Sequence, residues 1–159
     1  MQVFDASSII YAWDNYPEAQ FPKLWHWMAD QMSQGNIVMP EVAFKEVAHV
    51  APDCANWLDA NNLAQLPMND QIIQEAIRIK NLLGIVGDKY GAGVGENDLF
   101  IIATARSVRG RLISNEGFQA VTPLAMHKYK IPTVCAMKAV KVTCVNFVEF
   151  IKHSKVVFG

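Results

Sequence analysis

Four acidic residues lie beside apolar segments, where a carboxylate is costly to bury unless it is paired or bound to a cation. Asp5 lies within the apolar run VFDASSIIYA, and Glu116 follows the segment RLIS. Glu46 lies among apolar residues of a predicted helix, and Asp98 lies in the first turn of a helix that is otherwise apolar. Each residue alone is also explained by a capping, turn or surface role. Together they predict a shared site.

Carboxylates that gather in one place repel each other, so a cation is needed to hold them together. A site of oxygen ligands suits Mg²⁺ or Mn²⁺. Such an ion activates a bound water and stabilises charge on a phosphate, which is the chemistry of phosphodiester hydrolysis. We expect Ser7 and Ser114 to add hydroxyl contacts to the ligands, to the substrate or to a metal-bound water.

The elements that must position these residues alternate between strand and helix patterns. Strands are predicted over residues 3–12, 37–40, 63–67, 111–114 and 141–144. Helices are predicted over residues 21–35, 41–50, 52–58, 69–83, 96–108, 131–138 and 145–153, and a glycine-rich, mobile loop over residues 84–95. Alternation of this kind favours a three-layer α/β/α sandwich with a parallel sheet of four or five strands. Ligands of such sheets bind beyond the carboxyl ends of the strands.

The composition is that of one domain spanning residues 1–159. Hydrophobic residues make up 52% of the chain and charged residues only 18%, which disfavours a disordered chain. No apolar run reaches the roughly 18 residues of a membrane span, and the N-terminus lacks the basic flank of a signal peptide. Three cysteines without CxxC spacing disfavour a disulfide framework, so we expect a cytoplasmic protein.

The net charge of −1 hides a division between two parts of the chain. Residues 1–98 contain five Lys and Arg against 13 Asp and Glu, for a net charge of −8. Residues 99–159 contain nine against two, for a net charge of +7. This asymmetry is expected of an acidic cation site beside a basic surface for an anion, and chance scatter of solvated charges is the alternative explanation. The first candidates for that surface are Arg106, Arg109, Arg111, Lys128 and Lys130.

In their order and spacing, four segments resemble the PIN-domain nucleases, which include the VapC-type toxins of prokaryotic toxin–antitoxin pairs. These segments are VFDASSII, PEVAFKEV, ENDLFIIATA and LISNEGF, and they carry Asp5, Glu46, Asp98 and Glu116. The segment IPTVC at residues 131–135 is similar to one in an uncharacterised PIN-like family. The resemblance covers nearly the whole chain.

The resemblance implies a metal-dependent endoribonuclease with the four acids as catalytic residues and metal ligands, acting as a toxin with a protein antitoxin. Two departures bear on this. Glu116 stands where the toxins more often have an Asp with a further acid nearby, which leaves the number of metal ions open. The glycine loop is longer than in compact toxins, which bears on substrate access.

Other functions are less favoured by the residues. An inactive PIN-like binding module is the first alternative, although the presence of all four acids argues against it. An aspartyl-nucleophile phosphohydrolase needs a second Asp two residues after the first, where this chain has Ser7. The segment GAGVGE at residues 91–96 fits the GxGxxG nucleotide-binding motif badly.

One further prediction concerns the early helices. Large apolar side chains at Phe21, Trp25, Trp27 and Met28 are too many for one helix face, so we expect some of them to be exposed unless covered. They are interpreted as a surface for a homodimer or for an antitoxin.

Overall fold

A computed structural model describes all residues from 1 to 159. Five strands are present: β1 (Gln2–Phe4), β2 (Ile37–Pro40), β3 (Ala64–Leu66), β4 (Arg111–Ile113) and β5 (Cys144–Val145). The helices are α1 (Ala6–Asn15), α2 (Pro22–Ser33), α3 (Glu41–Val50), α4 (Pro52–Ala60), α5 (Asp70–Leu82), α6 (Glu96–Ser107), α7 (Ile131–Ala136) and α8 (Phe147–Ser154), with a short 3₁₀ helix η1 (Met126–Lys128).

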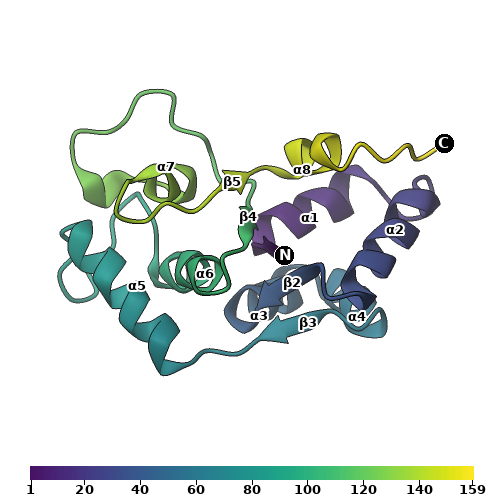
Figure 1. Cartoon of the computed structure of the whole chain (residues 1–159), viewed down its shortest axis with the longest axis horizontal. Coiled ribbons are helices and arrows are strands. Elements are labelled where there is room, and N and C mark those ends of the chain that lie inside the picture. Colours follow the sequence, from purple (N-terminus) through teal and green to yellow (C-terminus); the bar gives the residue numbers. More distant parts are fainter.

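The five strands form one sheet in the order β3-β2-β1-β4-β5, and all neighbouring strands are parallel. Helices α5, α6 and α7 lie to one side of the sheet and α1, α2 and α8 to the other (Figure 1). The predicted α/β/α architecture with a parallel sheet is therefore confirmed. Because every strand runs the same way, all five carboxyl ends meet at one edge, and β1 at the centre places Asp5 in the middle of that edge.

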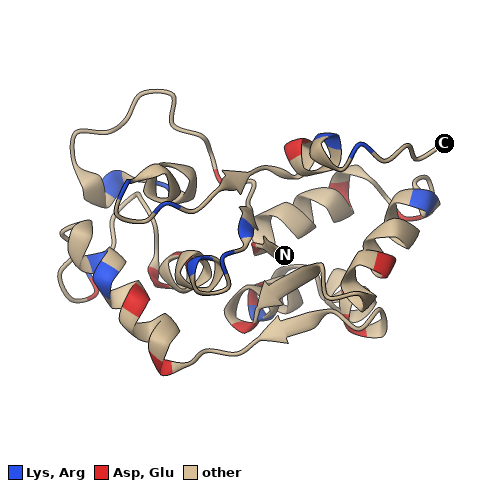
Figure 2. Ribbon diagram, viewed as in Figure 1, with Lys and Arg blue, Asp and Glu red and all other residues tan.

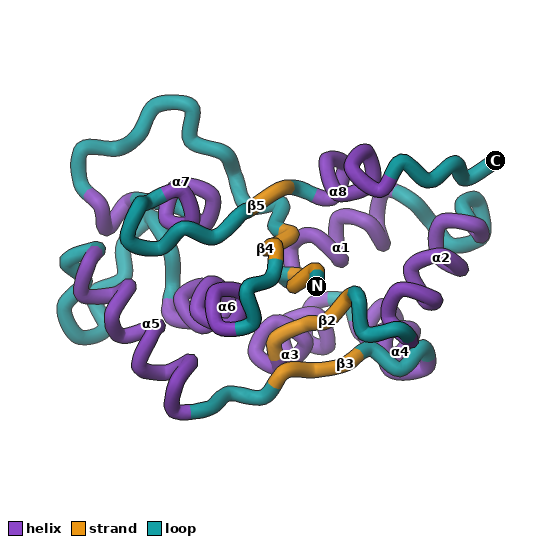
Figure 3. The backbone as a smooth tube through the Cα atoms, viewed as in Figure 1, coloured by secondary structure: helices purple, strands orange, loops and turns teal.

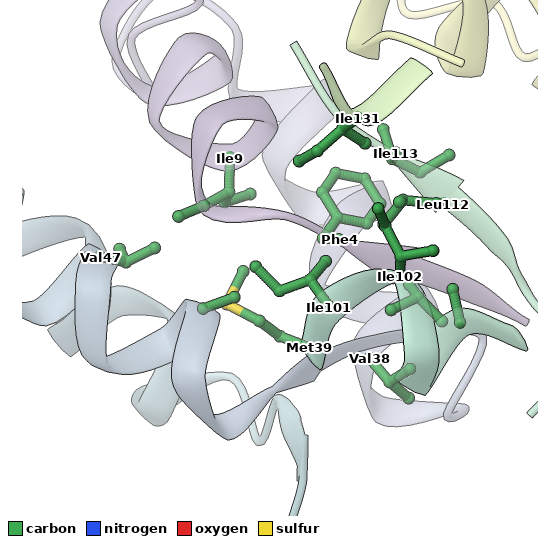
Figure 4. Packing of buried hydrophobic residues seen from close by; sticks show 14 of the residues in the cluster. Phe4, Ile9, Val38, Met39, Val47, Ile101, Ile102, Leu112, Ile113 and Ile131 are labelled. Atoms are coloured by element: carbon green, nitrogen blue, oxygen red, sulfur yellow. The ribbon is translucent and has the colours of Figure 1, made fainter. Parts of the chain in front are cut away.

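The core is formed by 38 buried hydrophobic residues on both sides of the short strands. Phe4 lies at its centre, close to Leu112 and Ile113 of β4 and to Ile101 and Ile102 of α6 (Figure 4). Residues of α6 are buried almost all round, which explains why its sequence shows no amphipathic pattern. A helix held this firmly fixes the place of Asp98 in its first turn.

The predicted strand over residues 3–12 is wrong after its first residues. Strand β1 ends at Phe4, and helix α1 begins at Ala6. Asp5 is the residue between them, and its extended backbone accepts the first helical hydrogen bond from the Ser8 amide. A buried strand and a buried helix both give continuous apolar runs, so periodicity alone did not separate them.

The bounds of two further predicted elements, both in the second half of the chain, are also wrong. Strand β5 comprises Cys144–Val145 rather than 141–144, and helix α8 starts two residues later than predicted, with Asn146 as its N-cap. The loop 84–95, predicted to be mobile, is attached near its C-terminal end, where the Val94 amide donates to the Tyr129 carbonyl and the Val94 side chain is buried. A Cβ at Gly93 would overlap the backbone of residues 127–129, so this close approach requires glycine.

The large aromatic residues of the early helices are mostly covered. Trp25 is buried against Trp13 and Trp57, and Trp27 packs against Phe150 and Phe158. Met28 is also buried, which leaves Phe21 as the exposed member of the predicted surface. The excess of apolar groups on α2 is therefore covered largely within the chain, by α1, α4, α8 and the C-terminal segment.

Long irregular segments connect the elements near the carboxyl edge of the sheet. The longest leads from β4 through η1 to α7 and arches away from the body of the molecule (Figure 3). No helix has the length and apolar character that crossing a membrane requires.

Candidate metal and nuclease site

Asp5 is the central residue of the candidate site and is almost fully buried, with 3% of its surface exposed. The junction between β1 and α1 holds it in place. The Asp5 amide donates to the Ile113 carbonyl at 2.9 Å, which continues the pairing of β1 with β4. The Ser8 hydroxyl donates to the carbonyls of both Asp5 and Ile113, each at 2.8 Å. The backbone at Asp5 is therefore fixed from two sides.

Two serines orient the Asp5 carboxylate. The Ser7 hydroxyl donates to Oδ2 at 2.6 Å, and the Ser114 hydroxyl donates to the same oxygen at 2.8 Å. The Asn115 amide in turn donates to Ser7 Oγ, and the Glu116 amide to Ser114 Oγ. Both hydroxyls that the sequence predicted as substrate contacts are thus engaged with Asp5. Both side-chain hydrogen bonds from the protein reach the same carboxylate oxygen, Oδ2.

Asp98 comes from the start of α6 and is held by the loop before it. Its Oδ2 accepts a hydrogen bond from the Gly95 amide at 2.8 Å, and Gly95 is the N-cap of the helix. Burial is the main reason that the pKa of Asp98 rises to about 6, and the charges of Asp5, Glu116 and Glu46 raise it further. The Gly95 hydrogen bond acts against this rise because it favours the ionised form.

Glu46 and Glu116 approach from the sides of this edge. Glu46 lies on α3 and is exposed to solvent, whereas Glu116 is half-buried in the segment after β4. The pKa of Glu46 is raised by partial desolvation of its carboxyl group and then by the charges of Asp5 and Glu116. The charges of Asp5 and Glu116 act on both Glu46 and Asp98, so the fold brings together residues spread over more than 110 positions.

The four carboxylates have no cationic partner in the protein. All salt bridges of the chain involve Glu75 or Glu149, and neither belongs to this group. At the same time, no three acidic, histidine or cysteine side chains already lie close enough to hold a metal ion together. The donor set, oxygen only and uncompensated, fits a hard divalent cation. The side chains would have to move closer, or bind through water, to hold it.

The basic residues predicted to bind RNA do not lie together. Arg106 is near the end of α6, Arg109 follows that helix, and Arg111 begins β4, so all three are at the amino edge of the sheet. Lys128 and Lys130 instead flank Tyr129, whose carbonyl accepts a hydrogen bond from the Val94 amide, two residues before α6 begins. Only these two lysines lie at the same end of α6 as Asp98. The arginines do not line the acidic site.

Sequence reasoning missed two residues that support this site. Ser8 is fully buried and joins the start of α1 to β4, as described above. Asn115 accepts a hydrogen bond from the Phe147 amide through Oδ1, which ties the segment after β4 to the start of α8. Ser8 could have been found from the run of small residues after Asp5, because two hydroxyls there suggest a capped helix start. Nothing in the sequence pointed to the Asn115 contact.

Comparison with known proteins gives a family without an assigned function. The family described as "Domain of unknown function (DUF4411)" matches residues 2–158, so the chain belongs to it. No curated protein matches the chain in sequence.

Solved structures give a clearer match. The crystal structure of VapBC2 from Rickettsia felis, bound to a DNA fragment from their promoter, contains a similar chain with a TM-score of 0.54 and 15% identity. The match covers 91% of this chain and 97% of that one. At this identity the likeness concerns the fold, and it confirms the PIN-like, VapC-type fold that the four sequence segments predicted.

Proposed function

We propose that this member of the DUF4411 family is a metal-dependent endoribonuclease. The observation that carries the proposal is the meeting of Asp5, Glu46, Asp98 and Glu116 at the carboxyl edge of the parallel sheet, without any cationic side chain to neutralise them. A structural cluster would be expected to contain arginine or lysine, because uncompensated like charges destabilise the fold. A cluster that binds a metal ion needs no such side chain, because the ion supplies the positive charge.

Mg²⁺ or Mn²⁺ held by these four residues would lower the pKa of a bound water and stabilise negative charge on the scissile phosphate. The residues of the chain prepare the site for this. Ser7 and Ser114 fix the Asp5 carboxylate through one oxygen, and the Gly95 amide fixes Asp98. Glu46 and Glu116 supply the remaining negative charge. Water attack needs no RNA 2′-hydroxyl, so the expected products carry a 5′-phosphate and a 3′-hydroxyl.

The pKa of Asp98 defines when the cluster is ready to bind a cation. With a pKa of about 6, Asp98 is partly protonated in weakly acidic solution and ionised at pH 7 and above. A proton and a cation compete for the same carboxylate. Cleavage should therefore fall as the pH is lowered through about 6, and higher Mn²⁺ concentration should shift that fall to lower pH.

The experiment is cleavage of a mixed RNA substrate with added Mg²⁺ or Mn²⁺, with identification of the product ends. The native protein should cleave and Asp5→Asn should not, whereas Asp30→Asn, an exposed change of the same kind on α2, should cleave at the native rate. Native-rate cleavage by Asp5→Asn, or products with a 2′,3′-cyclic phosphate, would overturn the proposed mechanism.

The second candidate is a binding module without activity. It is favoured by one observation, the lack of three ligands already at coordinating distance. A module of this kind would bind RNA in the absence of divalent ions and leave it intact when they are added. The cleavage experiment therefore separates the two functions.

We further propose that the protein acts as a toxin with a protein antitoxin. The similar solved structure is of the pair VapBC2, and this supports a partner for a chain of the same fold. The segment between β4 and η1 offers apolar contacts for such a partner, since Phe118, Val121 and Leu124 are each at least 82% exposed.

A partner encoded beside this chain should co-purify with it. Phe118→Ser combined with Leu124→Ser should weaken that association, because each change removes exposed apolar area that a partner would bury. A matched change elsewhere, Val50→Ser on α3, should leave it intact. Equal recovery of the partner by all three proteins would exclude this segment as the contact.

A further inference from the structure

A second polar surface lies at the opposite end of α6 from the carboxylates. Two adjoining clefts, with volumes of about 360 and 470 Å³, share Arg106 and Arg109. The first is completed by Lys141 and Thr143 from the segment before β5, and the second by Arg78 of α5. Figure 2 shows basic segments of α5, α6 and the chain before β5 on the same side of the molecule.

Two of the four cations build the walls of these clefts. Arg78 and Arg106 both bind Glu75, at 2.5 and 2.8 Å respectively. Arg78 also donates to the Ala139 carbonyl at 2.7 Å, and Arg106 donates to the Val140 carbonyl. These bonds tie α5 and α6 to the segment before β5. Glu75 is the one acidic residue of the clefts, and it is already shared between two arginines.

The other two cations have no such partner. Arg109 and Lys141 are exposed, and neither forms a salt bridge or a side-chain hydrogen bond. Both also adopt left-handed backbone conformations, with φ of 52° and 51°. That conformation costs about 1 kcal/mol or more for a residue with a side chain and is usually occupied by glycine or asparagine. Long cationic side chains at both positions are therefore not explained by the local fold.

The lining of the clefts indicates the kind of ligand. Besides the cations, the larger cleft contains Gln71, Gln74 and Ser107 and no hydrophobic residue. Guanidinium groups, amides and hydroxyls are the groups that contact phosphate oxygens in nucleic-acid complexes. Ala105 and Val142 are the only hydrophobic residues of the smaller cleft, which is little apolar surface for a peptide. Neither cleft contains an aromatic residue, so the stacking platform that unpaired bases use is absent. The ligand that fits is a phosphodiester backbone, bound without regard to base sequence.

We propose that Arg109 and Lys141, placed by Arg78 and Arg106, form a second RNA-backbone binding site at the amino edge of the sheet. The rise from Asp98 to Arg106 along α6 is about 12 Å, so the site is separate from the carboxylates. It would hold the part of a long RNA that extends away from the cleaved bond. The choice of RNA as the ligand rests on the proposed function, but binding is measured independently of cleavage, so the two can fail separately.

The test measures binding of a fluorescent single-stranded RNA of about 20 nucleotides, longer than most single-strand footprints. A metal chelator in the buffer prevents cleavage of the RNA by the native chain. Arg109→Gln with Lys141→Gln should weaken binding roughly tenfold at low salt. It should also make the dependence of log affinity on log salt shallower, by about 0.7 for each lost phosphate contact.

Two further variants control for effects of the substitutions on folding and on the total charge of the protein. Lys152→Gln with Lys155→Gln removes the same charge from an exposed position on α8 and from the residue that caps its C-terminus. Lys155 also has a left-handed backbone, with φ of 57°. This control should bind RNA as the native protein does. Arg109→Gly relieves the strained backbone and should be at least as stable as the native protein, yet it should lose affinity as Arg109→Gln does.

Equal affinity and equal salt dependence of the cleft variant and the α8 control would overturn the proposal. So would binding of polyglutamate of matched charge with the same affinity and the same dependence on Arg109 and Lys141. That result would assign the clefts to an acidic protein segment. Weaker binding of RNA alone would support the second site, whether or not the protein cleaves RNA when metal is added.

Discussion

The two ends of helix α6 carry charges of opposite sign, and they differ in whether the acidic groups there have cationic partners. At its start, Asp98 lies with three other acids that have no counter-charge, and its pKa is raised to about 6. Near its end, Arg106 binds Glu75, and hydrogen bonds and charges from Arg78 and Arg106 lower the pKa of Glu75. At the start of α6 the acidic charges repel one another, whereas near its end the acidic charge of Glu75 is neutralised by two arginines. From this contrast we expect a cation to bind at the acidic end.

The largest effect expected from this contrast is on catalysis. Asp98→Asn keeps the side-chain oxygen that accepts from the Gly95 amide but removes a charge that would hold the cation. Cleavage should fall by about 100-fold or more, since loss of a metal ligand removes both affinity and activity. Glu75→Gln, an equal change of charge at the other end, should cleave at close to the native rate. Similar cleavage rates for the two variants in a single-turnover assay would contradict the proposed difference between the two ends of α6.

The next effect is on stability and has opposite signs at the two ends. In the metal-free protein at pH 8, Asp98→Asn should raise the free energy of unfolding by about 2–3 kcal/mol, because a pKa raised from 3.8 to about 6 means that ionised Asp98 opposes folding. A raised pKa contributes stability that is present below the ordinary value and lost as pH rises through about 6. The gain from the substitution should therefore shrink as the pH falls through about 6 and vanish below the ordinary value of 3.8, where Asp98 is neutral in both the folded and the unfolded state.

Glu75→Gln should have the reverse pH dependence. A lowered pKa contributes stability above the ordinary value of about 4.5 and loses it as the pH falls through the folded value. The substitution should therefore cost about 1 kcal/mol at pH 7, and less at pH 3, because the ion pairs are partly exposed. Urea melts of Asp98→Asn and Glu75→Gln across this pH range would measure the free energy of unfolding of each variant and its pH dependence. Changes of the same sign at pH 8 would contradict the contrast.

A smaller effect tests how the acidic end is held in place. Ser114→Ala removes one of two hydroxyls that orient Asp5 and should cost about 1 kcal/mol of stability. Cleavage should fall about tenfold while the metal requirement stays, because outer contacts of this kind tune ligands without replacing them. Ser33→Ala, which removes an exposed hydroxyl on α2, provides the control. Cleavage by Ser114→Ala at the rate of this control would show that the orientation of Asp5 does not depend on Ser114.

Much of this arrangement was predictable from sequence because it depends on local patterns. Three of the four acids were predicted beside strand ends or a helix start, which a parallel sheet brings together, and Glu46 was predicted on an apolar helix face. Residues 3–12 could not be divided correctly, since a buried strand followed by a buried helix leaves no change in hydrophobicity. Only the Asp5–Ser8 contacts show where the strand ends.

The basic residues show a different limit. Their clustering in the second half of the chain suggested one RNA surface, but α6 separates Arg106 and Arg109 from Lys128 and Lys130. Sequence distance says little about which end of a helix a later loop will reach. Likewise, the apolar excess at Trp25 and Trp27 suggested a partner, whereas residues far along the chain, Phe150 and Phe158, cover Trp27. Such long-range contacts leave no mark in a local pattern.

The most direct test of the acidic site is the effect of divalent ions on thermal stability. Addition of Mg²⁺ or Mn²⁺ should raise the melting temperature of the native protein, because a ligand bound only by the folded state stabilises it. Asp30→Asn should show the same rise, and Asp5→Asn should lose most of it while remaining as stable as the native protein without metal. An equal rise in Asp5→Asn, or no rise in the native protein, would contradict a cation site built around Asp5.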